Sequence, residues 1–142
     1  MKRIEQIGGF FATLALALVC ASCGQGKITQ CNALIGVINK GVKNIDGNKG
    51  PADASGLKTV ADTMDQIAAE AAQVKLSVAE LQKFSTDYQG MAREVATAAR
   101  AMAGALDAKD SGNVSNAQTA MEKAVKQEDA LIEGINSFCQ AP

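Results

Sequence analysis

The sequence predicts an all-α fold, an antiparallel up-down four-helix bundle. Four segments place apolar residues alternately three and four positions apart, which is the period of one helix face. Stretches rich in Gly, Pro, Ser or Asn separate most of these segments, as expected for connections. Only 4% of the residues are aromatic and Ala is abundant, whereas strands favour aromatic and β-branched side chains.

The first helix is expected over residues 29–45, and the stretch that follows, residues 46–51 (DGNKGP), should end it because Gly and Pro interrupt helices. The second helix should begin near Asp53, a residue type that caps helix starts. The third and fourth are expected to carry their apolar faces over residues 81–105 and 114–138, separated by the polar break at residues 111–113.

The second and third helices have no Gly or Pro between them, so one long helix is the alternative. Two observations favour a turn at residues 75–77. The apolar spacing of the second helix continues to position 85, but Phe84 is the apolar residue. In addition, Ser77-x-x-Glu80 has the spacing of a capping box, in which Ser accepts a hydrogen bond from a free backbone N–H.

The amino terminus has the three-part layout of a secretory signal peptide. Lys2 and Arg3 are followed by an apolar run at residues 7–19 and then by small residues. A transmembrane helix needs roughly 20 apolar residues. The shorter run here therefore favours a cleaved signal peptide over a permanent span.

The small residues that end this leader, Ala21-Ser22-Cys23, resemble the lipobox of bacterial lipoproteins. In that family the Cys is acylated and becomes the new amino terminus. The position three residues before the modified Cys is usually Leu, Val or Ile, and here it is Cys20. The resemblance implies an extracytoplasmic protein of the cell envelope, held to a membrane by a lipid on Cys23. It leaves open whether that membrane is the inner or the outer one.

Cleavage before Cys23 divides the chain into a signal peptide at residues 1–22, a lipidated tether at 23–28 and a four-helix bundle domain at 29–142. The tether is rich in Gly, so we expect it to be flexible. When extended it spans at most roughly 17 Å. The bundle should therefore lie close to the bilayer.

Two other interpretations of the leader cysteines remain open. Cys20-x-x-Cys23 has the spacing of a redox pair, although such a pair needs a helix start to lower a thiol pKa. Ordinary cleavage after Ala21 would release a soluble protein with three cysteines. Lipidation removes Cys20, uses Cys23 and leaves only Cys31 and Cys139. Because an oxidising compartment favours an even count, the cysteines favour lipidation.

The two remaining cysteines also test the topology. Cys31 opens the first expected helix and Cys139 closes the last. In an up-down bundle these two ends meet only if the number of helices is even. A disulfide needs Cα atoms within about 7 Å, so a Cys31–Cys139 bond and a four-helix count support each other. The alternative is that both are buried apolar residues without a bond.

The composition excludes several chemistries. The chain has no His, which excludes His-based acid–base catalysis and His-ligated metal or haem. It has no basic block, so nucleic-acid binding is not expected. Met64, Met91, Met102 and Met121 suggest a thioether metal site, but all four lie on the expected core faces. We therefore expect core packing and no metal or cofactor.

Glu128 interrupts the apolar face of the fourth helix. Its position should place it level with Tyr88 or Arg93 of the third helix. The functional interpretation is a polar site or partner contact formed by these three residues, because a buried carboxylate needs a partner. The alternative, which we favour, is a small shift of register that leaves Glu128 at the edge of the seam with access to solvent.

Residues 31–35 (CNALI) at the start of the first helix and residues 135–139 (INSFC) at the end of the last add a second resemblance. Together with the leader, they resemble a group of uncharacterised bacterial predicted lipoproteins with a small helical-bundle domain. That resemblance implies the lipid anchor and the paired cysteines and supplies no activity.

The sequence therefore predicts a lipid-anchored envelope protein that is not an enzyme and serves as an interaction or scaffold module. Its expected partners are a membrane, through the lipid, and another envelope protein. The alternative is a bundle that binds a small ligand or lipid in a cavity lined by its Ala-rich third and fourth helices. The remote alternative is an enzyme that uses Glu128, Arg93 and Tyr88.

Overall fold

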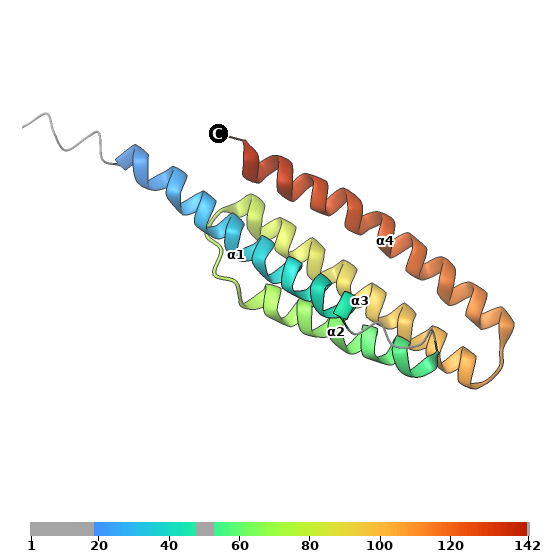
Figure 1. The fold of residues 1–142 in the computed structure, drawn as a ribbon. Helices are drawn as coiled ribbons and strands as arrows, with labels where there is room; N and C mark the ends of the chain where they lie inside the picture. The colour runs from blue at the N-terminus through green and yellow to red at the C-terminus, as the bar shows by residue number, and fades with distance from the viewer. Residues whose placement is uncertain (1–18, 48–52, 142) are drawn as a thin grey trace, which may run out of the picture.

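The computed structural model describes residues 19–47 and 53–141, which form four helices (Figure 1). They are α1 (Val19–Gly47), α2 (Ala54–Gln73), α3 (Ala79–Asp107) and α4 (Ser111–Gln140). No strand occurs among the described residues, so the prediction of an all-α four-helix bundle is confirmed. Most of the expected signal peptide, residues 1–18, lies outside the described residues.

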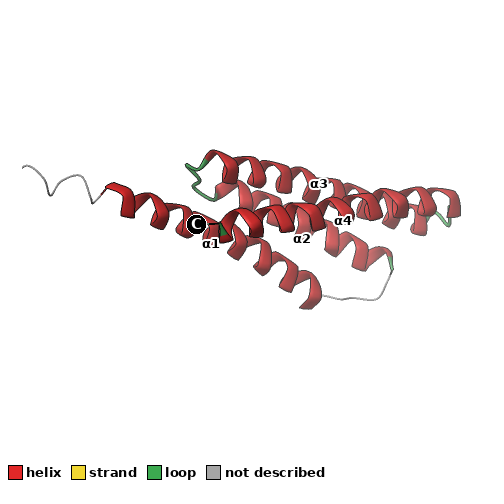
Figure 2. Ribbon diagram, turned by 90° about the horizontal axis from the view of Figure 1, so that it is seen from above, coloured by secondary structure: helices red, strands yellow, loops and turns green. Residues whose placement is uncertain are grey.

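The helices alternate in direction, as an up-down bundle requires (Figure 1). The start of α1, the connection between α2 and α3, and the end of α4 lie at one end, which we call the disulfide end. The connection between α3 and α4 lies at the opposite, distal end. α3 packs extensively against both α2 and α4, whereas α1 packs mainly on α2 and meets α3 and α4 only sparsely (Figure 2).

α1 begins well before the expected start at residue 29, so residues 23–28 are helical rather than an extended tether. No Pro interrupts this stretch, and Lys27 is held against the end of α4. Its Nζ donates a hydrogen bond to the carbonyl oxygen of Ala141 at 2.7 Å and lies 4.6 Å from the ring centre of Phe138. Because a helix rises about 1.5 Å per residue, residues 23–28 cover roughly 8 Å instead of 17 Å.

Short polar side chains set the starts of α2 and α4. Asp53 Oδ1 accepts a hydrogen bond from the backbone N–H of Gly56 at 2.9 Å, which confirms the expected N-cap. Asp110 Oδ1 accepts one from the N–H of Asn113 at 3.1 Å. Residues 111–113, expected as a break, therefore form the first turn of α4 instead.

The end of α3 has the hydrogen bonds of a Schellman motif. The N–H of Lys109 donates to the carbonyl of Leu106 at 3.1 Å, and the N–H of Asp110 donates to that of Ala105 at 2.9 Å. Lys109 has a φ of 56°, in the left-handed region that glycine occupies most easily. A lysine at this position is strained by its own Cβ.

The expected turn between the second and third helices is confirmed, but the capping box is wrong. α3 begins after Val78, and no side chain of its own first turn caps it. Gln30 of α1 binds the backbone just before α3 instead: its Oε1 accepts from the N–H groups of Ser77 at 2.6 Å and Val78 at 3.1 Å. The Ser77 hydroxyl is occupied as well, because it accepts a hydrogen bond from Gln30 Nε2 at 3.0 Å.

The core is rich in alanine and takes more of its buried residues from α3 than from any other helix. Met64 and Met91 are buried and Met102 and Met121 are half-buried, as the packing interpretation expected. α1 approaches α2 closely at Gly41, where an added Cβ would collide with Ile67. This contact fixes α1 on α2 in the last third of α1.

Candidate functional site

The disulfide end is the most tightly connected part of the molecule. Cys31 of α1 and Cys139 of α4 form a disulfide with Cα atoms 5.8 Å apart, which confirms the predicted pair. Cys31 is 3% exposed. Phe138 beside it packs on Phe84 of α3 with ring centres 6.1 Å apart. Together with the contacts of Lys27, these interactions join α1, α3 and α4 at one point.

Cys23 lies in α1 on the amino-terminal side of Cys31. It therefore belongs to the same end of the bundle as the disulfide, roughly two helical turns further out. Its side chain lies outside the part of the chain whose side chains are described. Among the described residues, no helix is both long and apolar enough to span a membrane.

The structure brings two of the three candidate polar residues together. Tyr88 is fully buried, and its hydroxyl donates a hydrogen bond to Oε1 of the half-buried Glu128 at 3.4 Å. This distance is long for such a bond, which makes it weak. Glu128 thus combines both expectations: it lies at an edge with solvent access, and it contacts Tyr88.

Burial dominates the electrostatics of this pair. It raises the pKa of Glu128, and the neighbouring charge of Asp129 adds to the rise, whereas the hydrogen bond from Tyr88 opposes it. The pKa of Tyr88 is also raised, first by burial and then by the negative charge of Glu128. Tyr88 is therefore a hydrogen-bond donor at neutral pH.

Arg93 does not belong to this pair. It lies five residues after Tyr88, about 140° further around α3, and its side chain is exposed. It lines a surface depression together with Lys123 of α4. The structure therefore does not form the expected three-residue site. Tyr88 contacts Glu128, and Arg93 lies on another side of α3.

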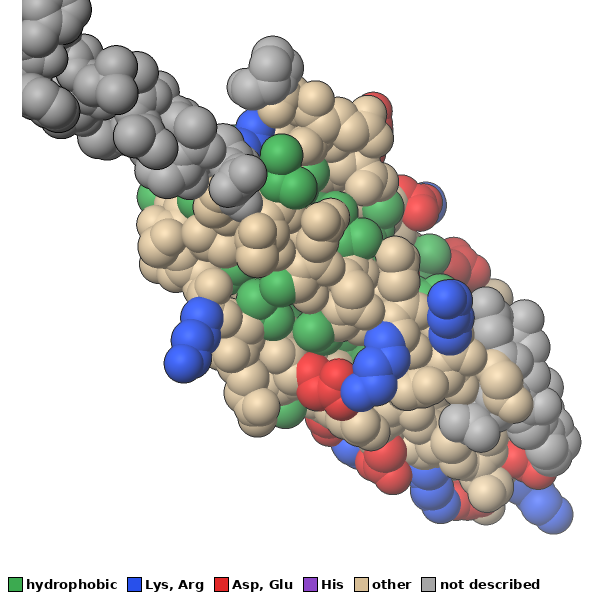
Figure 3. Space-filling model, turned by 60° about the vertical axis from the view of Figure 1, so that its left-hand side comes forward, with side chains coloured by type: hydrophobic (Ala, Val, Ile, Leu, Met, Phe, Trp, Pro, Cys, Tyr) green, Lys and Arg blue, Asp and Glu red, His purple; other side chains and the backbone are tan. Residues whose placement is uncertain are grey.

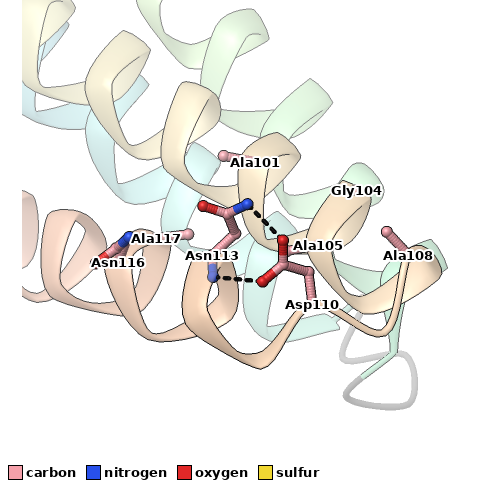
Figure 4. Close-up of a pocket in the computed structure, with 8 residues that line it drawn as sticks. All are labelled: Ala101, Gly104, Ala105, Ala108, Asp110, Asn113, Asn116 and Ala117. Atoms are coloured by element: carbon pink, nitrogen blue, oxygen red, sulfur yellow. Dashed lines mark hydrogen bonds between the residues drawn. The ribbon is translucent and has the colours of Figure 1, made fainter.

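A groove follows the seam between α3 and α4. It consists of three adjoining depressions of about 510, 470 and 440 Å³, two of which share Ala101 and Ala117 and two of which share Glu94. Figure 4 shows its distal end, where Asn113 Nδ2 also donates to Asp110 Oδ2 at 2.7 Å. The groove lies on the surface, whereas the alternative function called for a cavity between these helices.

The described residues contain no group of three or more Cys, Asp or Glu side chains placed to hold a metal ion. Sequence reasoning missed two residues that organise the disulfide end, Lys27 and Gln30. Both are polar residues whose partners are far away in the sequence, so no local pattern marks them. Only the bundle topology, which places the start of α1 beside the α2–α3 connection and the end of α4, points to them.

No family model, no curated protein sequence and no solved structure matches the chain. The features that bear on its function are therefore its leader, its disulfide end and its surfaces.

Proposed function

We propose that the protein is a lipoprotein of a bacterial-type cell envelope, anchored by a lipid on Cys23, and that its bundle is a non-enzymatic interaction or scaffold module. The observation that carries the proposal is the Cys31–Cys139 disulfide. Such bonds form and persist in oxidising compartments outside the cytoplasm. The bond also uses the two cysteines that remain after cleavage before Cys23, so lipidation leaves no unpaired thiol.

The position of the disulfide supports a membrane-proximal arrangement. A lipid on Cys23 would be connected to the disulfide end by roughly 12 Å of helix. The bundle would then extend from the bilayer with the α3–α4 connection furthest away. This arrangement suits a module that meets a partner at the membrane surface.

A non-enzymatic role is supported by how the candidate polar residues are arranged. General acid–base or nucleophilic catalysis needs a reactive group within hydrogen-bond reach of a base, at a site open to substrate. Tyr88, the partner of Glu128, is fully buried, and Arg93 is on another side of α3. We therefore keep catalysis by these residues as a remote alternative only.

Mass spectrometry of the protein purified from membranes tests the anchor. We expect an amino-terminal Cys23 that carries acyl chains, and we expect Cys23→Ser to remain as an unprocessed precursor. Cys20→Ser is the matched control, because it changes the neighbouring leader cysteine and should still be processed. An unmodified amino terminus at Ser22 would refute the anchor.

A second candidate function is the binding of a small ligand or lipid in the surface groove between α3 and α4, in place of the cavity that the sequence suggested. Its floor is lined by alanines, including Ala98, Ala101 and Ala117. Native mass spectrometry of the protein extracted in mild detergent should then show a bound molecule. Ala101→Phe should displace that molecule by filling the groove. If the Ala101→Phe variant still carries the bound molecule, the second candidate function is refuted.

A further inference from the structure

The seam between α1 and α4 is closed only near the disulfide. The disulfide holds these helices together at one end, but beyond it α1 follows α2 and has few contacts with α4. Figures 1 and 2 both show the distal half of α1 lying apart from α4. Two apolar side chains that a closed bundle would bury between these helices, Val42 of α1 and Val125 of α4, are exposed.

The face of α4 that looks toward α1 follows from the disulfide. Cys139 points to α1, and Ile132 and Val125 lie seven and fourteen residues before it, so they share its face within about 40°. Glu128 lies eleven residues before Cys139, on the same face within about 20°. Val125 is 45% exposed, and Ile132 and Glu128 are half-buried.

The corresponding face of α1 carries Ile35 and Val42, four and eleven residues after Cys31. Val42 is 39% exposed and Ile35 is half-buried. Because the helices run in opposite directions from the disulfide, Val42 lies roughly level with Glu128, each about 16 Å along its helix. We call these five residues the open seam: Ile35, Val42, Val125, Glu128 and Ile132.

The α4 edge of the open seam is acidic. Glu122 and Asp129 are exposed beside Val125 and Glu128, and Lys126 is an exposed cation on the same side of α4. No ion pair to these three carboxylates is found in the described part of the chain. Among the α1 residues whose side chains are described, this edge offers Asn39 and the positive charge of Lys43. Figure 3 shows one side of the molecule, where separate hydrophobic patches lie among polar atoms and both acidic and basic side chains occur along the upper right edge.

We propose that the open seam docks a basic amphipathic helix of a partner protein. The inference rests on the proposed function and deepens it by naming the surface and the chemistry of the partner. An amphipathic helix laid into an apolar groove is a recurring mode of recognition. The apolar face of such a helix would cover Val42, Val125 and Ile132. Its Lys or Arg side chains would reach the carboxylates of Glu122, Glu128 and Asp129.

The negative charge of the open seam favours a basic helix over two other possible occupants, a second copy of the chain and a fatty acid. A second copy of the chain would bring the same carboxylates against the seam, and like charges oppose association. A fatty acid would bring its own carboxylate to an acidic edge.

The length of the open seam also fits a short helix. The stretch from Ile35 to Val42 is about 10 Å long, which corresponds to roughly two turns of a docked helix with anchors at i, i+3 or i+4, and i+7.

The test uses the full lipidated protein in phosphatidylcholine nanodiscs, which carry no net charge. The probe is a fluorescent 18-residue amphipathic helix of Leu and Lys, and the same helix with Glu in place of Lys is its control. We expect the Lys helix to bind, with an affinity that falls as salt rises. The double variant Glu122→Gln, Asp129→Asn should weaken binding roughly three- to tenfold.

A matched variant separates the seam from general acidity. Asp87→Asn with Glu94→Gln removes two exposed carboxylates beside the α3–α4 groove and should leave binding unchanged. Val125→Lys should abolish binding, and circular dichroism checks that this surface variant folds. Equal losses in the two double variants, or equal binding of the Glu helix, would overturn the proposal.

Two further measurements separate the outcomes. Sedimentation measures whether the protein dimerises. If the unmutated protein is a dimer and the Val125→Lys variant is a monomer, the seam binds a second copy of the chain and the proposal is overturned. The mass of the mature amino terminus is measured on the same sample. If Cys23 carries no lipid while the Lys helix still binds at the seam, the anchor fails and the docking inference stands. If the lipid is present and the helix does not bind, only the docking inference fails.

Discussion

Removing the disulfide, by Cys31→Ala together with Cys139→Ala, should lower the free energy of unfolding by about 5 kcal/mol. The bond closes a loop between residues 108 positions apart. In the chain-entropy model, a loop of this length restricts the unfolded chain by about 16 cal/mol/K, or about 5 kcal/mol at room temperature. Marginally stable small domains have total stabilities of about 5–15 kcal/mol, so the loss is large.

Guanidinium chloride unfolding followed by circular dichroism measures the loss, and reduction of the unmutated protein should produce a loss of similar size. Hydrogen exchange should rise most at the start of α1 and the end of α4, because these helices have few other contacts with each other. Two free thiols at Cys31 and Cys139 in the non-reduced folded protein, or a loss below about 1 kcal/mol, would refute the reasoning.

Three further predictions test local features. Gly41→Ala should destabilise the protein by about 1–3 kcal/mol because its Cβ collides with Ile67, whereas Gly36→Ala, in open space on the same helix, should stabilise it slightly; denaturant unfolding compares the two. Lys109→Gly should raise the melting temperature by relieving a φ of 56°, a gain of about 1 kcal/mol, and an unchanged melting temperature would contradict the strain. Burial raises the pKa of Glu128 above 4.5, so the folded protein holds that proton more tightly than the unfolded chain. This stabilisation is present below about pH 4.5 and is lost as pH rises through the raised pKa; Glu128→Gln should therefore be more stable by about 0.5–1 kcal/mol at neutral pH, and the difference should vanish in unfolding experiments at acidic pH.

The helix pattern and the disulfide were predictable because both depend on features that the sequence displays directly. Apolar spacing fixes which residues face the core, and Asp53 caps its helix through a local contact. The Cys31–Cys139 pair followed from the parity of the helices, since an even number brings the two ends together. Tyr88 and Glu128 were expected at the same level by counting residues along two antiparallel helices.

The two wrong predictions, the capping box at Ser77 and the tether at residues 23–28, share a physical cause. In both places residues far away in the sequence make the contacts, and a local pattern does not show them. Ser77 had the spacing to cap α3 by itself, but Gln30 of α1 binds its hydroxyl and the N–H groups of Ser77 and Val78. Residues 23–28 had the composition of a tether, but Lys27 docks on the end of α4. Neither contact is visible until the disulfide end is assembled, because each joins residues far apart in the chain.

Glu128 disfavours closure of the seam between α1 and α4 beyond the disulfide. If α1 closed against α4, Val42 would cover Glu128, which lies at its level, and the carboxylate would lose solvent with only the weak hydrogen bond from Tyr88 as a partner. Burying an unpaired charge costs several kcal/mol, more than the roughly 2 kcal/mol gained by covering one Val side chain. A helix that brings a Lys or Arg removes this cost, because it covers Val42 and Val125 and pairs Glu128 at the same time. The residue that interrupts the apolar face thus disfavours closure within the chain and favours closure by a basic partner.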